Sequence, residues 1–340
     1  MRQLRFLSRR LLFLCLVLPA VTLITFMVSR VIPGDPVSLM AGPLVPMATR
    51  ERLRAEWGLD KPLPVQYLIY LEHLLHGDLG KSFYTGRSVG YDLAAFFPAT
   101  LELSTAALCI GLPIAVVGGV TAAARKDTVL DYTIRVAINL GLALPVFWLG
   151  ILLILVFSGQ LGWLPSLGRI SPQVMIPPHI TGLYVIDSVL AGDTRTLADT
   201  LAHLALPAFC LAIGVVAPIA RITRTSMLWA LQQDFIRTAR AKGVRARRVT
   251  YHHALPNALL PAITSIGLVY GLLLGGAVVT ETVFSWPGIG LYVTTAILSL
   301  DFQPVISLTL LSAVAYAFIN MIVDIAYGFI DPRAERPTET

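Results

Sequence analysis

The sequence predicts an all-α membrane protein with six transmembrane helices, and three observations support this fold class. The 340 residues are 56% hydrophobic and only 14% charged, whereas soluble globular chains are about 25% charged. Six apolar stretches each reach the length of about 20 residues that a bilayer-spanning helix needs. Lys and Arg gather in alternate connections between these stretches, which is typical of multi-pass membrane proteins.

The six expected spans follow one another in order, with one long interruption. They cover residues 11–32, 100–124, 133–157, 201–220, 259–283 and 304–330. This pattern divides the chain into an N-terminus with the first span (1–32), a segment outside the membrane (33–98), a five-helix core (99–330) and a short tail (331–340). The outer segment carries six basic and seven acidic residues, and a segment of this length crosses the membrane largely regardless of its charge.

The basic residues predict the orientation. More than half of the 26 Lys and Arg residues lie in the N-terminus, in the link after the second span, in the link after the fourth span and in the tail. Because Lys and Arg remain on the cytoplasmic side, both termini are expected in the cytoplasm. The same bias accounts for the net charge of +6, so the charge requires no nucleic-acid partner.

Several classes of chemistry lack their motifs. Gly80-Lys81-Ser82 resembles the end of a phosphate-binding loop, but Leu75 occupies the position of the first glycine. The six histidines form no H-E-x-x-H motif and there is no G-x-S-x-G motif. The three cysteines are dispersed in apolar stretches. We therefore expect no catalytic residues, no metal site and no cofactor bound by this chain.

Few charges fall inside the expected spans. Arg135 lies early in the third span and Asp324 late in the sixth, while Glu102 and Glu281 lie near outer ends. Such charges are functional candidates, but a charge that pairs or snorkels near the membrane surface is the more frequent interpretation. Asn320 and Asp324 are four residues apart, so they share a helix face and are candidates for a buried polar cluster.

Glycines form a stripe on the fifth span. Gly267, Gly271 and Gly275 are spaced by four residues, which places them on one face where another backbone can approach closely. That neighbour is either a helix of the same bundle or a partner subunit. Prolines within or at the ends of several spans predict kinked helices.

The link at 221–256 is the most informative segment. It is long and basic, and residues 231–244 read as a short helix that Asp234 can cap and Gly243 can terminate. Ala239 and Gly243 provide a small face, with Phe235 and Ile236 as apolar anchors. The segment is either a solvated basic helix or a helix on which a partner protein docks.

This link resembles the cytoplasmic loop of ABC importer permeases, E-A-A-x-x-x-G followed after nine residues by I-x-L-P. Gly243 matches the glycine, Ala239 the second alanine, and Leu255-Pro256 the closing pair. Arg237 and Thr238 replace the Glu and the first Ala, and His253 replaces the Ile. No role that needs a carboxylate is therefore transferred to position 237.

Further motifs resemble the "B" permease of dipeptide and oligopeptide importers, in order along nearly the whole chain. They are Ile32-Pro33-Gly34-Asp35-Pro36, His76-Gly77-Asp78-Leu79-Gly80, Pro98-Ala99-Thr100-Leu101-Glu102-Leu103, Arg221-Ile222-Thr223-Arg224-Thr225-Ser226-Met227, Phe284-Ser285-Trp286-Pro287-Gly288-Ile289-Gly290 and Asp331-Pro332-Arg333. Each motif is weak alone, but the ordered set is specific.

The resemblance implies a type I importer permease fold in the bacterial inner membrane. It implies pairing with a second, related permease subunit, two ATP-binding subunits that hydrolyse ATP, and an external substrate-binding protein. The expected ATPase-coupling residues are Phe235, Arg237, Thr238, Ala239, Arg240 and Gly243.

The cargo and the class of transporter both leave alternatives. The cargo is expected to be dipeptides or oligopeptides, but the same branch also moves nickel complexes, glutathione, opines and haem. A solitary secondary carrier would show inverted repeats and polar groups near the midplane, neither of which is evident. An intramembrane enzyme would need a nucleophile or metal set that the sequence lacks.

Overall fold

The computed structural model describes residues 18–27, 46–56, 60–275 and 277–330, with helices as the regular elements of that part. The side chains of residues 324–330 lie outside the described part, as do most of the first expected span and the tail. Within these limits the all-α membrane fold is confirmed. Four helices are long and apolar enough to cross a membrane, or five if a bent pair counts as one span, so the count of six is not reached by the described residues.

The four long helices match expected spans but differ in extent. They are α5 (Val89–Ala124), α9 (Thr194–Ala230), α12 (Leu255–Leu274) and α15 (Phe302–Ile330). Helix α5 starts inside the segment expected outside the membrane, and it continues through Pro98 and Pro113. The fifth span was expected to reach Val283, but α12 ends at Leu274 and a separate helix, α13 (Val278–Val283), follows. Glycines at the end of α12 favour this break.

The third expected span is broken. Helix α6 (Val129–Ala143) is followed by α7 (Val146–Leu153) and by the π-helix η1 (Ile154–Gln160), and the two halves are bent by 96°. Pro145 occupies the N-cap of α7. Because proline has no N–H and disfavours a helical residue before it, the backbone turns at Leu144-Pro145 instead of continuing straight.

Shorter helices lie between these spans. The outer segment contains α3 (Met47–Glu56) and α4 (Leu63–Leu75), and α8 (Tyr184–Leu190) precedes α9. An apolar helix covers Leu18–Met27, within the first expected span. After α13 comes α14 (Ile289–Leu298), an apolar helix of ten residues that the sequence pattern did not predict.

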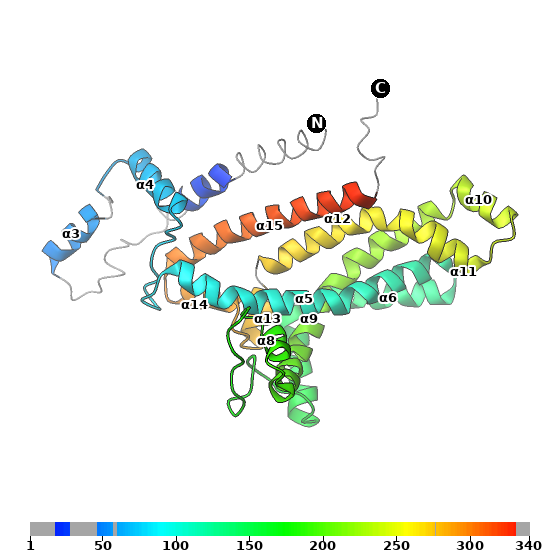
Figure 1. The fold of residues 1–340 in the computed structure, drawn as a ribbon, viewed down its shortest axis with the longest axis horizontal. Coiled ribbons are helices and arrows are strands. Elements are labelled where there is room, and N and C mark those ends of the chain that lie inside the picture. The colour runs from blue at the N-terminus through cyan, green and yellow to red at the C-terminus, as the bar shows by residue number, and fades with distance from the viewer. Residues whose placement is uncertain (1–17, 28–45, 57–59, 276, 331–340) are drawn as a thin grey trace, which may run out of the picture.

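Figure 1 shows how these elements are arranged. Helices α5, α12 and α15 run along the long axis, with α3 and α4 at one end and α10 (Asp234–Ala241) and α11 (Ala246–Arg248) at the other. Helices α5 and α9 pack closely, because a Cβ on Gly119 would lie 2.7 Å from the carbonyl oxygen of Ala220. Trp286 is fully buried and donates its indole N–H to the Ala99 carbonyl at 2.8 Å, which fixes the chain after α13 against α5.

Candidate coupling site

Helix α10 is a short exposed helix with defined ends. Gln233 occupies the N-cap position, and Asp234 is the first helical residue. The expectation that Asp234 caps the helix is therefore wrong, because its side chain is 93% exposed and pairs with Arg237 at 3.1 Å. Gly243 does end the helix, with φ +74° and its N–H donated to the Arg240 carbonyl at 2.9 Å. This left-handed conformation favours glycine.

The two faces of α10 differ sharply. Ile236 is 0% exposed and Ala239 is 8% exposed. Phe235 is 43% exposed, and four further predicted residues are also exposed, namely Arg237, Thr238, Arg240 and Gly243. Ala239 was expected on the docking face, but it packs inside this chain. The candidate contact surface is therefore limited to the five exposed residues.

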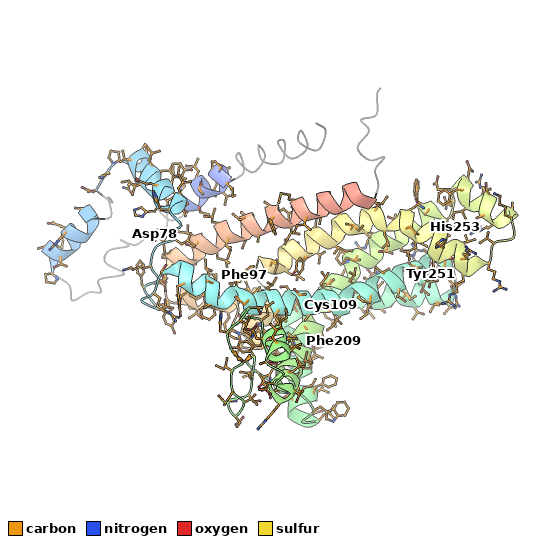
Figure 2. All side chains as sticks on the ribbon, in the orientation of Figure 1. Asp78, Phe97, Cys109, Phe209, Tyr251 and His253 are labelled. Carbon is orange, nitrogen blue, oxygen red and sulfur yellow. The ribbon has the colours of Figure 1, made fainter. Side chains whose placement is uncertain are left out.

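The packed face of α10 belongs to an apolar cluster that includes residues of several membrane helices. Ile236 and Ala239 belong to one hydrophobic cluster with residues of α5, α9, the π-helix η2 (Val249–Ala254) and α12. The other members are Val120, Ala123, Met227, Ala230, Val249, Ala254 and Ala258. Figure 2 labels Tyr251 and His253 of η2 beside this end of the bundle and Asp78 at the opposite end. Helix α10 packs on η2, and through this cluster it is connected to three long helices.

An ion pair joins α6 to α9 near the same end. Asp131 accepts hydrogen bonds from Nε of Arg224 at 2.9 Å and from its Nη2 at 2.8 Å. The Asp131 side chain is fully buried, and Nε of Arg135 lies 3.4 Å from the same carboxylate. A bidentate pair constrains the relative orientation of the two side chains in addition to pairing their charges. It therefore fixes the position of α6 relative to α9.

A second ion pair joins the loop before α8 to α5. Arg169 donates from Nε (2.9 Å) and Nη2 (2.7 Å) to Glu102 of α5, with both side chains buried. The other Glu102 oxygen accepts the Val185 N–H at 2.7 Å, and Arg169 stacks 3.7 Å from the ring centre of Tyr184. The loop before α8 is thereby attached to α5. Glu281 is held without a cation, by the Thr100 hydroxyl at 2.7 Å and the Leu291 N–H at 3.0 Å.

The glycine stripe faces a helix of the same chain. A Cβ on Gly271 would lie 2.7 Å from Cδ2 of Tyr316, and one on Gly267 would collide with Val323, both on α15. Gly275 is the C-cap of α12, where a Cβ would lie 3.8 Å from Ser312. The sequence left open whether a helix of the same bundle or a partner subunit lies against this stripe. In the structure, α15 of the same chain lies against it.

The remaining predicted polar pair lies only partly within the described residues. Asn320 is half-buried on α15, and the Asp324 side chain falls outside the described part. Within the described residues no group of three His, Cys, Asp or Glu side chains is arranged to hold a metal ion. The features left as candidates are thus contact surfaces and ion pairs between helices.

Comparison with known proteins decides the family. Residues 115–336 match the family model "Binding-protein-dependent transport system inner membrane component", and residues 3–104 match the N-terminal model of such membrane components. The chain belongs to this family. It is an inner membrane component of a binding-protein-dependent transport system, and thus a multi-pass permease.

Curated relatives of this permease span nearly its whole length. It is 45% identical over 323 residues to the "Probable D,D-dipeptide transport system permease protein" of Escherichia coli strain K12, covering 95% of each chain. It is 43% identical to a di/tripeptide permease protein of Pseudomonas aeruginosa, covering 97% of this chain and 98% of the relative. A dipeptide permease protein of Alkalihalophilus pseudofirmus is 39% identical, with coverages of 97% and 99%.

Sequence reasoning missed both ion pairs between elements of this permease. Arg224 was noted only as part of a motif and Asp131 was not singled out, because residues 93 apart in the chain give no sign of pairing. Arg169 was likewise not singled out. An acidic residue directly before an expected span, as Asp131 is before the third, is a signal that could have marked the first pair.

Proposed function

We propose that this permease is one membrane subunit of an ATP-driven importer that carries short peptides, dipeptides and oligopeptides, by alternating access. The observation that carries the proposal is the set of relatives named for dipeptide or di/tripeptide transport, at 39–45% identity over nearly the whole chain. The ordered motifs of the sequence support the same branch.

The proposed assembly contains four other subunits. A second, related permease completes the path through the membrane, two ATP-binding subunits hydrolyse ATP, and an external binding protein delivers the peptide. In this proposal the chain itself holds no nucleotide and catalyses no reaction. The exposed face of α10 supports it, because Phe235 offers an apolar anchor beside Arg237 and Arg240, and buried aromatic and Arg residues dominate protein contacts.

Movement of the ATP-binding subunits would reach the membrane through α10. Its packed face shares one apolar cluster with α5, α9, η2 and α12. Because packed interiors resist deformation, α10 should carry these helix ends with it when its partner moves. Coupling of this kind is a shift between two states that a partner binds with different affinity.

We also propose that the α10 end faces the cytoplasm, with both chain termini on that side. The concentration of Lys and Arg in the link around α10 supports this orientation. Helices α3 and α4 then lie outside, at the opposite end of the bundle (Figure 1). That position suits contact with the external binding protein.

Uptake by cells tests the proposed cargo. A strain lacking this chain but keeping its companion subunits should fail to accumulate a radiolabelled dipeptide, and the wild-type chain should restore uptake. Unlabelled tripeptides should compete, whereas a nickel complex, glutathione, an opine and haem should not. Undiminished dipeptide uptake without the chain, or competition by one of these other cargos alone, would contradict the peptide assignment.

A further inference from the structure

A basic cavity lies near the α10 end of the bundle, outside the coupling site. It has a volume of about 100 Å³, several times what a single water molecule needs. Its floor is formed by small residues of α5, including Gly119, and its polar lining is provided by Arg135 and Asn139 of α6 and by Arg221 and Arg224 of α9. Three arginines from two helices therefore converge on one small space.

These arginines carry more charge than their neighbours neutralise. Asp131 is the acid that contacts them, through Arg224 at 2.8 Å and Arg135 at 3.4 Å. Arg221 is exposed, and among the described residues it forms no ion pair within 4.0 Å. Asp127 also acts on Arg224 through its charge, so two carboxylates face three guanidinium groups and the cavity keeps an excess of positive charge.

One of the three arginines also has an unused donor. Nε of Arg135 is buried and makes no hydrogen bond within the described part of the chain. Both Asp131 oxygens already accept hydrogen bonds from Arg224. The Arg135 side chain is 39% exposed as a whole, so an anion with several oxygens could reach the rest of its guanidinium group together with Arg221.

The cavity opens beside an apolar surface. Tyr132, Val136 and Leu140 succeed one another every fourth residue on α6 and are 55%, 56% and 60% exposed. The Tyr132 ring also lies 4.5 Å from the Arg135 guanidinium, and aromatic rings beside basic groups are typical of the membrane surface. An occupant with an anionic head and apolar tails fits this combination of neighbours.

We propose that this cavity binds the phosphate of an anionic phospholipid from the cytoplasmic leaflet. Arg135 and Arg221 would bind the phosphate oxygens, and the acyl chains would lie along Tyr132, Val136 and Leu140. Basic pockets between membrane helices on the cytoplasmic side take headgroups of this kind. The inference rests on the proposed orientation and is independent of the cargo.

The structure favours a lipid over two other anions. Inorganic phosphate would satisfy the arginines but would leave the exposed α6 stripe without an occupant. A peptide carboxylate could also reach Arg221, but the flanking stripe is apolar and continuous rather than polar. Both anions serve as competitors in the test.

Lipid binding can be measured without transport. The full permease with its companion subunits would be purified in mild detergent, and native mass spectrometry would count bound lipid during titration with phosphatidylglycerol or phosphatidylcholine. The test variant is Arg135→Gln with Arg221→Gln, which leaves the Asp131–Arg224 pair intact. The control is Arg247→Gln, which removes an exposed positive charge of α11 outside the cavity.

We expect the double variant to bind phosphatidylglycerol on the order of ten-fold more weakly, while the control binds as the wild type does. Equal affinity in the wild type and the double variant would overturn the proposal. So would equal binding of phosphatidylcholine, or displacement of the lipid by inorganic phosphate or by a dipeptide. Because uptake does not enter the measurement, failure here leaves the transport assignment intact.

Discussion

Asp131 and Arg224 lock α6 to α9 through two hydrogen bonds of 2.9 Å and 2.8 Å to a fully buried carboxylate. The pair stands close to the point where α9 leads into α10. Removal of one partner of a buried pair leaves the other charge without compensation, which costs about 3 kcal/mol or more. The two helices should therefore depend on this contact for their relative position.

Asp131→Asn tests that dependence. We expect the melting temperature of the purified permease to fall clearly, because Arg224 loses its charged partner and Arg135 its nearest acid. Asp127→Asn is the matched control, since the Asp127 side chain is 68% exposed and lies 3.7 Å from the ammonium group of Lys126. Similar melting temperatures for the two variants would contradict the structural role of Asp131.

Glu102→Gln should loosen the loop before α8. The variant keeps the shape of the side chain but leaves the charge of the buried Arg169 guanidinium uncompensated. The free energy of unfolding should fall by about 3 kcal/mol. Hydrogen exchange of residues 169–185 should therefore accelerate. Asp78→Asn, which alters an exposed pair with His73, should leave exchange in that loop unchanged, and equal acceleration in both would refute the prediction.

The glycine contacts predict opposite effects for two Gly→Ala changes. Gly271→Ala should destabilise the permease by about 1–3 kcal/mol, because the added Cβ would lie 2.7 Å from Tyr316. Gly214→Ala places a methyl group in open space in the interior of α9, where alanine favours a helix by up to about 1 kcal/mol. Thermal unfolding of both variants measures the difference, and a stabilising Gly271→Ala would contradict the packing of α12 on α15.

The stability of the loop before α8 should also depend on pH. Burial raises the pKa of the Asp187 carboxyl, but hydrogen bonds from the Thr181 side chain and from the Thr181 and Gly182 N–H groups outweigh it, so the pKa lies below its usual value. A lowered pKa in the folded state contributes stability above the unfolded value of about 3.9, and this contribution is lost as the pH falls further.

The measurement is hydrogen exchange of residues 180–187 as a function of pH, corrected for intrinsic exchange. Protection in the wild type should decrease below about pH 4. In Asp187→Asn the protection should be weak throughout and lack this step. A step of the same size in both proteins would assign the acid response to another group.

Composition and residue spacing were enough to predict the helical membrane fold and the end of α10. Apolar stretches located the long helices, and positive φ at Gly243 agrees with its expected place at the end of α10. The features that were not predicted depend on tertiary contacts or on the effect of a single residue within a uniform stretch. The bend at Pro145 arises from a single proline in an otherwise uniform apolar stretch, and the burial of Ala239 depends on the side of α10 that meets α9 and η2. The pairing of Asp131 with Arg224 requires the fold itself.

We propose that the exposed side of α10 binds an ATP-binding subunit, and Gly243→Glu tests this contact. Gly192→Glu is the matched control. Both glycines have positive φ, +74° and +66°, and open space around the missing Cβ, so the backbone strain is the same. Gly192 lies between α8 and α9, away from α10.

The measurement is the amount of ATP-binding subunit that co-purifies with each variant, relative to the amount of permease in the membrane. We expect Gly243→Glu to lose the ATP-binding subunits and peptide uptake while remaining in the membrane, and Gly192→Glu to keep both. Equal recovery of the ATP-binding subunits with the two variants would contradict it.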